Sequence, residues 1–164
     1  MKHIFINTPS TILSPCRIYR YSLWREWIGG EGYVLFIGLN PSTADETQDD
    51  PTIRRCINFA KAWGFSGVYM ANLFAFRATD PKVMMQADDP IGRDNDAWLR
   101  TLSSSASLVV GAWGVGGSYM GRDREVCQLI GAMDCLGLTK GGHPRHPLYV
   151  RADVELVDFT IRRT

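Results

Sequence analysis

The stretch that decides the fold is YVLFIGLNPS, residues 33–42. Its first five residues form an unbroken apolar run bounded by glycines, which is typical of a strand buried on both faces. Its last five, GLNPS, have the composition of a turn, because an asparagine side chain before a proline initiates turns. A helix is predicted next, since Asp50 suits the N-cap, Pro51 suits the first helical position, and Gly64 follows the last apolar residue at helical spacing.

The same strand-and-helix unit recurs along the chain. Buried core strands are predicted at residues 33–38, 67–72, 107–113 and 136–141, and helices from Asp94 to Ser104 and from about Asp123 to Asp134. An aromatic-rich segment at 17–24 predicts a further strand, and the weakly alternating segment 154–161 predicts an edge strand. Strands that alternate with helices favour an α/β fold, with three α/β/α layers and a mainly parallel four-stranded central sheet. No repeat or linker interrupts residues 1–164, so a single domain with its core at 17–150 is expected.

Composition narrows the function classes. The chain has 164 residues, 45% hydrophobic and 21% charged, with a formal net charge of +1. These values are ordinary for a globular domain and exclude disorder or coiled coil as the main state. A charge near zero gives no overall attraction to nucleic acid, so such binding would need a local basic patch. The apolar runs are too short to cross a membrane, and residues 1–10 do not resemble a signal peptide, so a cytoplasmic location is expected.

The four cysteines do not predict a metal centre. Cys16, Cys56, Cys127 and Cys135 form no C-x-x-C pair and have no zinc-finger spacing to a histidine. Three of them lie on apolar segments, where a free cysteine behaves as a small buried hydrophobe. We therefore expect neither a metal nor another cofactor.

Unusual polar motifs directly follow the predicted core strands. Asn40 follows the first strand, Asn72 ends the second, a glycine-rich turn begins at Gly114, and GGHPRHP, residues 141–147, follows the fourth. The carboxyl ends of parallel strands meet at one edge of a sheet, where α/β proteins form their sites. Asn40, Asn72 and His143 are therefore predicted to line one cleft.

Most of these motifs also have an ordinary structural explanation. Turn chemistry alone explains the GLNPS segment, and the glycines after Gly114 match no known phosphate-binding loop, so they can simply permit close packing. Asp45 can be a solvated acid, and the HPRHP segment a rigid surface loop. Asn72 is harder to explain this way, because burying an amide without partners is costly.

In order and context, the four segments resemble the motifs of the uracil-DNA glycosylase superfamily. The matching residues are Gly38-Leu39-Asn40-Pro41, Asn72, Trp113-Gly114 and His143-Pro144, the last followed by Arg145 where the superfamily has serine. The chain is also similar to a little-characterised family of bacterial and phage domains, DUF1643, through YRYSLW at 19–24 and GLNPSTAD at 38–45.

The superfamily resemblance implies a nucleobase-recognising protein that hydrolyses an N-glycosidic bond in DNA or in a nucleotide. Asn40 or Asp45 would position the attacking water, and Asp45 would stabilise the cationic sugar. His143 would donate to the departing base, and Asn72 would bind the base edge. The remaining substrate contacts would come from Gly38, Leu39, Pro41, Ser42, Gly114 and Arg145, with Arg122 as a second candidate for phosphate.

Two other readings stay open at this stage. One is a non-catalytic module that binds a nucleic acid or nucleotide in the same pocket. The other is an enzyme for a phosphate ligand, centred on the turn at Gly114. The sequence does not decide between DNA, RNA and a free nucleotide, and it leaves the oligomeric state open.

Overall fold

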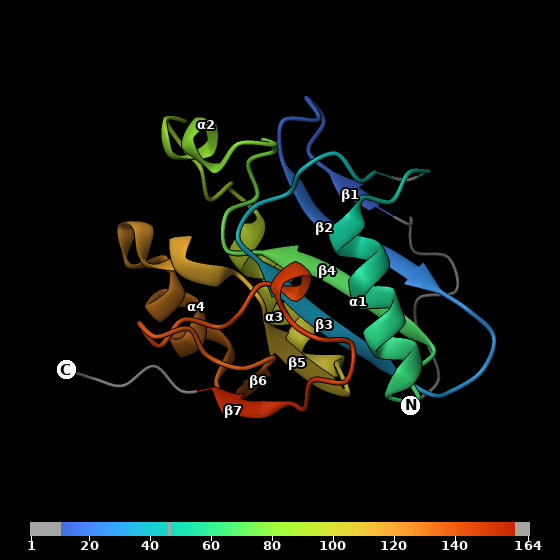
Figure 1. Cartoon of the computed structure of the whole chain (residues 1–164). Helices are drawn as coiled ribbons and strands as arrows, with labels where there is room; N and C mark the ends of the chain where they lie inside the picture. The colour runs from blue at the N-terminus through green and yellow to red at the C-terminus, as the bar shows by residue number, and fades with distance from the viewer. Residues whose placement is uncertain (1–10, 46, 160–164) are drawn as a thin grey trace.

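A computed structural model describes residues 11–45 and 47–159 of the chain (Figure 1). The strands are β1 (Thr11–Leu13), β2 (Arg20–Glu26), β3 (Tyr33–Gly38), β4 (Gly67–Asn72), β5 (Leu108–Gly111), β6 (Met133–Cys135) and β7 (Val157–Phe159). The helices are α1 (Pro51–Ala62), α2 (Pro81–Met85), α3 (Asn95–Ser105) and α4 (Arg122–Ile130), with 3-10 turns η1 (Gly114–Gly121) and η2 (Pro147–Tyr149). No helix in these two stretches is long and apolar enough to span a bilayer.

The strands form one seven-stranded mixed sheet in the order β1-β2-β4-β3-β5-β6-β7. The pairs β4–β3, β3–β5 and β5–β6 are parallel, whereas β1–β2, β2–β4 and β6–β7 are antiparallel. The prediction of an α/β fold is thus confirmed, but the mainly parallel four-stranded sheet is not, because β1, β2 and β7 join the four core strands in one mixed sheet. The additional strands are antiparallel and extend both edges of the sheet.

The central strand β3 divides the core into two layers. Val34 and Phe36 pack with buried residues of α1, while Leu35 and Ile37 pack with those of α3 and α4. Both sets are fully buried, which explains why this strand is apolar without alternation. Figure 1 shows α1 in front of the sheet and α3 behind it.

Local sequence patterns predicted the approximate positions of several elements correctly. Helix α1 begins where predicted, because the Asp50 carboxylate accepts the N–H of Ile53 at 2.8 Å. The strand predicted at 17–24 is β2, shifted to Arg20–Glu26, and the edge strand predicted at 154–161 is β7, although residues 160 and 161 lie outside the described part.

The prediction was wrong for the fourth core strand. It was expected at 136–141, but β6 is Met133–Cys135, and the preceding helix ends at Ile130 rather than near Asp134. Gly131, with φ of +91°, ends this helix in a conformation that side-chain-bearing residues rarely adopt. The third core strand is also shorter than its predicted range of 107–113, since β5 stops at Gly111.

Candidate functional site

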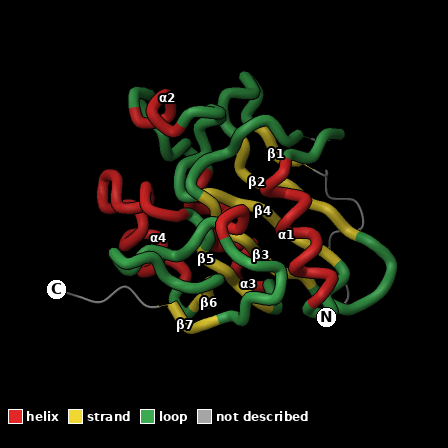
Figure 2. Tube along the Cα trace, viewed as in Figure 1, coloured by secondary structure: helices red, strands yellow, loops and turns green. Residues whose placement is uncertain are grey.

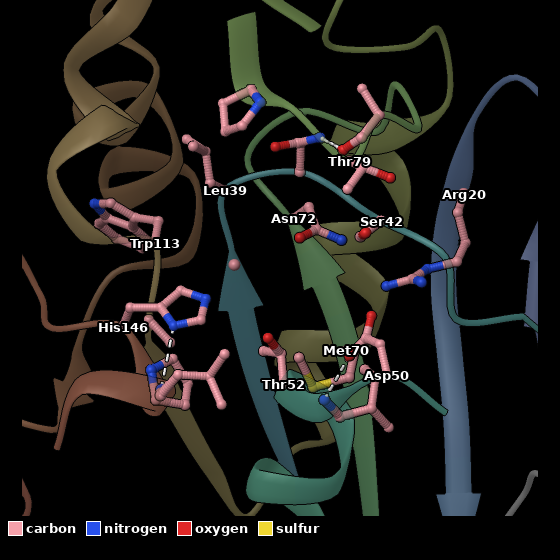
Figure 3. A pocket seen from close by; sticks show the side chains of 18 of the residues that line it. Arg20, Leu39, Ser42, Asp50, Thr52, Met70, Asn72, Thr79, Trp113 and His146 are labelled. Atoms are coloured by element: carbon pink, nitrogen blue, oxygen red, sulfur yellow. Dashed lines mark hydrogen bonds between the residues drawn. The ribbon is translucent and has the colours of Figure 1, made fainter. Parts of the chain in front are cut away.

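A cavity of about 380 Å³ lies at the carboxyl ends of β3 and β4 (Figure 3). Figure 2 shows that loops, rather than regular elements, follow both strand ends. The polar lining residues are Arg20, Asn40, Ser42, Asp50, Thr52, Asn72, Thr79 and His146; the others are Gly38, Leu39, Ile53, Met70, Ala78, Pro81, Ala112, Trp113, Pro147, Leu148 and Tyr149. This volume and this mixture of an apolar lining with a few polar groups are typical of small-molecule sites.

Asn72 forms the floor of the cavity as the last residue of β4. Its side chain is 4% exposed, and its Nδ2 has no hydrogen-bond partner within residues 11–45 and 47–159. A Cβ at the neighbouring Gly38 would come within 2.8 Å of Asn72 Oδ1, so glycine is required for the amide to lie where it does. A buried amide donor without an acceptor is costly to keep. Because Asn72 lines the cavity, a ligand or a water inside it can accept this hydrogen bond.

Arg20 enters the cavity from the first position of β2. It is 3% exposed, and its Nη1 donates to the carbonyl oxygen of Ala44 at 2.8 Å. Burial lowers the pKa of this guanidinium to about 10, opposed by the negative charge of Asp50, so it remains protonated at neutral pH. In Figure 3 the guanidinium points into the cavity between Ser42 and Asp50.

Asp50 supplies a carboxylate on the same side of the cavity. One oxygen, Oδ1, caps helix α1 through Ile53, which fixes the orientation of the whole group. A carboxylate has a second oxygen, and Asp50 is partly exposed along the cavity wall. It can therefore accept a hydrogen bond from a ligand or a water while it caps the helix.

His146 stands opposite, at the start of η2 (Figure 3). Its Nδ1 accepts the N–H of Leu148 at 3.2 Å, so in the neutral imidazole the proton resides on Nε2. Burial lowers the pKa of His146, while the charge of Asp50 acts in the opposite direction. The side chain therefore presents a neutral N–H donor at neutral pH.

Two aromatic residues, Trp113 and Tyr149, are also among the lining residues. Trp113 is buried two residues after the end of β5. Tyr149 is 79% exposed at the end of η2, with its ring centroid 5.5 Å from that of His146. An exposed tyrosine beside a cavity offers a flat apolar surface on which a planar ligand can stack.

The residues predicted to bind substrate divide into two groups. Gly38, Leu39, Asn40, Ser42 and Asn72 line the cavity, as expected from their positions after β3 and β4. Pro41, Asp45, Gly114, His143 and Arg145 are not among the lining residues. The predicted cleft thus contains Asn40 and Asn72 but not His143.

Asn40 and Asp45 both have structural partners. The Nδ2 of Asn40 donates to the carbonyl oxygen of Ala78 at 2.8 Å, which fastens the loop after β4. Asp45 Oδ1 accepts the N–H groups of Thr47 and Gln48, each at 2.9 Å, and these bonds lower the pKa of the carboxyl group. Asp45 therefore stabilises its own turn.

His143 lies in a tight hairpin rather than at the cavity. Thr139 donates its N–H to the His143 carbonyl at 2.8 Å, and the Arg145 N–H donates to Gly137 at 2.9 Å. The exposed Arg145 side chain donates to the Leu138 carbonyl, and Gly114 donates its N–H to Pro144. The second His-Pro pair of this loop, His146-Pro147, is the one that reaches the cavity.

Several lining residues were not selected as site residues from the sequence, and Arg20, Asp50 and His146 are the most important of them for the chemistry of the cavity. Asp50 was recognised, but as a helix cap, and His146 was recognised as part of the basic loop. No local signal distinguishes Arg20 from the other arginines. Across residues 11–45 and 47–159, no group of three or more His, Cys, Asp or Glu side chains is arranged to hold a metal ion.

Comparison with known proteins gives one match. The family model described as a protein of unknown function (DUF1643) matches residues 20–148. No curated protein and no solved structure matches the chain significantly. The matched range includes the strands that form the cavity and both sides of its polar lining, and the chain therefore belongs to the DUF1643 family.

Proposed function

We propose that the cavity recognises the base of a nucleotide, and that the chain hydrolyses the N-glycosidic bond of that nucleotide. The observation that supports this proposal is the buried, unpartnered amide of Asn72 on the cavity floor. A side-chain amide carries two donors and an acceptor, which complement the amide-like edge of a nucleobase. Binding such an edge would satisfy the Nδ2 donor and remove its burial cost.

The proposed reaction uses groups from opposite sides of the cavity. Asp50 holds a water through the oxygen that does not cap α1 and accepts its proton as the water attacks C1′ of the sugar. The C1′–N bond breaks, and its electron pair leaves with the base. His146 donates its Nε2–H to the negative charge that develops on the base, which is an oxyanion-hole role.

These assignments replace two roles that the superfamily resemblance implied. Asp50 takes the water-positioning role in place of Asp45, because the Asp45 carboxylate is engaged in its own turn. His146 takes the leaving-group role in place of His143, because His146 lines the cavity. Asn40 holds the loop that carries Ala78.

A non-catalytic nucleotide-binding module is the second candidate. This candidate is favoured because the side chains of Asn40 and Asp45 hydrogen-bond to the protein itself and are not available to position a water. Asp50 is then the residue proposed to position the attacking water. Asp50 itself is partly occupied by its helix-capping bond. A pocket that binds but does not hydrolyse would have the same Asn72 floor.

Single-turnover base release distinguishes the two candidates. The substrates are oligonucleotides and free nucleotides that carry uracil, hypoxanthine or modified pyrimidines, and the variants are Asp50→Asn and Asp45→Asn. We expect base release by the wild type, a loss on the order of 10²–10³ in rate for Asp50→Asn, and a change of a few-fold for Asp45→Asn. Binding without release from any substrate would refute hydrolysis and leave the binding module. Loss in Asp45→Asn alone would refute the assignment of the carboxylate.

A further inference from the structure

Arg20 is a buried cation that forms no ion pair with any carboxylate the structure describes. Among the described residues, no acidic side chain lies within ion-pair distance of its guanidinium, and its Nε has no hydrogen-bond partner. Within the described part of the chain, its guanidinium donates one hydrogen bond, to the Ala44 carbonyl. A guanidinium has five N–H donors, so most of its donor capacity is unused.

Arg122 shows how this fold satisfies a buried guanidinium. It is 2% exposed, close to the 3% of Arg20. Its Nη2 and Nη1 form ion pairs with Asp96 and Glu125, at 2.5 and 3.4 Å, and its Nε donates to the Leu73 carbonyl at 2.8 Å. Asp50 lies close enough to raise the pKa of Arg20 but forms no ion pair with it among residues 11–45 and 47–159, so the Arg20 guanidinium keeps free donors for a bound anion.

The surroundings of Arg20 define what that counter-charge is. Its guanidinium points into the cavity, whose wall also carries the hydroxyl groups of Ser42 and Thr79 and the amide of Asn72 (Figure 3). The planar guanidinium fork and neighbouring neutral donors match the oxygens of a phosphate group. The Asp50 carboxylate also lines the cavity and would repel a phosphate placed next to it. It can accept a hydrogen bond from a hydroxyl group of the sugar.

We propose that Arg20 binds the phosphate of the nucleotide whose base Asn72 recognises, so that the ligand is a nucleotide rather than a nucleoside or a free base. This inference rests on the proposed function for the identity of the base, whereas the anion site rests on Arg20 alone. Because Arg20 and Asn72 line the same cavity, one nucleotide could place its phosphate at Arg20 and its base at Asn72. A free nucleotide and a nucleotide unit flipped out of DNA share this chemistry.

The first test uses the wild-type chain and needs no variant. Calorimetry measures binding of inorganic phosphate, of the four common ribonucleosides and deoxyuridine, of their 5′-monophosphates, and of a uracil-containing single-stranded oligonucleotide. We expect a 5′-monophosphate to bind about 10- to 100-fold more tightly than its nucleoside, the range of a charge-assisted hydrogen bond. Tighter binding of the oligonucleotide than of the monophosphates would identify nucleic acid as the source of the phosphate.

Two matched variants test the role of the charge. Arg20→Met removes the charge and keeps much of the side-chain volume, and Arg25→Met is its control. Arg25 lies on the same strand and holds the same loop, through the Asp45 carbonyl and the Asp49 carboxylate, but it does not line the cavity. We expect Arg20→Met to abolish the preference for the monophosphate and Arg25→Met to retain it.

The outcomes separate this inference from the proposed function. Equal wild-type affinity for nucleoside and monophosphate would overturn the phosphate site but leave base recognition intact. Binding of inorganic phosphate that requires Arg20, without binding of any nucleoside or nucleotide, would support the anion site and overturn base recognition. An equal loss of preference in both variants would assign the effect to the loop, and would overturn the role of Arg20.

Discussion

Replacing Asn72 with leucine should make the unliganded chain more stable and weaken its ligand binding. Leucine has nearly the shape of asparagine but no polar atoms, so the substitution removes the Nδ2 donor that is buried without a partner. The cost of such a donor is about 1–3 kcal/mol. After an allowance for water in the cavity, we expect the free energy of unfolding to rise by about 1 kcal/mol. For a chain of this length, the melting temperature would rise by about 2–4 °C.

Asn95 provides the matched control for this experiment. It is fully buried, and its Oδ1, like Asn72 Nδ2, has no hydrogen-bond partner among the described residues. The Nδ2 of Asn95, in contrast, donates to the carbonyl oxygens of Asn72 and Leu73, at 3.0 and 3.1 Å. We expect Asn95→Leu to lower the free energy of unfolding by about 1–2 kcal/mol, because two hydrogen bonds are lost. Thermal unfolding followed by circular dichroism measures both variants without ligand. A similar fall in melting temperature for the two variants would refute the argument that the Asn72 amide is kept for a ligand.

Three further predictions follow from single contacts. Gly38→Ala places a Cβ 2.8 Å from Asn72 Oδ1, so we expect lower stability, by about 1–3 kcal/mol, and weaker nucleotide binding; unchanged affinity in calorimetry would show that the amide moves without cost. Asp45 has a lowered pKa, so its contribution to stability is present above its ordinary value of 3.8 and is lost as the pH falls through the lowered value; Asp45→Asn should remove this part of the acid dependence in urea unfolding. His146 also has a lowered pKa, because burial disfavours its charged form, so the wild type should lose stability as the pH falls below 6.5. His146→Gln should make the free energy of unfolding depend less on pH in this range. A steeper dependence in the variant would contradict the argument.

The elements that local sequence predicts best are those with one uninterrupted signal. Strands β3 and β4 have continuous apolar runs and appear as predicted, and Asp50 with Pro51 correctly marks the start of α1. Strand β6 was missed because Met133 continues the apolar spacing of the preceding helix, and the strand has only three residues. The pairing of β2 with β4 depends on contacts between distant segments, which no local pattern contains.

The candidate site was predictable where it follows directly from strand ends. Asn40 was found because it follows β3, and Asn72 because it is the last residue of β4. Which of His143 and His146 reaches the cavity depends on a hairpin in which Leu138 pairs with Pro144. The register of this hairpin cannot be read from the sequence, because both histidines are followed by proline.

The positions of Asp50 and Arg20 in the cavity depend on the path of the loop at 41–50. Arg20 holds this loop through the carbonyl oxygen of Ala44, and Arg25 holds it through that of Asp45. These contacts join segments about 20 residues apart, so the sequence alone identified Asp50 as a cap and not as part of a site.

The most direct test of base recognition observes the Asn72 side chain itself. The two N–H signals of its amide can be identified in a ¹⁵N–¹H spectrum by their absence from the Asn72→Leu variant. During titration with a nucleoside 5′-monophosphate, we expect these signals to shift and to saturate with the affinity measured by calorimetry. Saturable binding that shifts other signals and leaves those of Asn72 unchanged would contradict the assignment of this amide as the group that recognises the base.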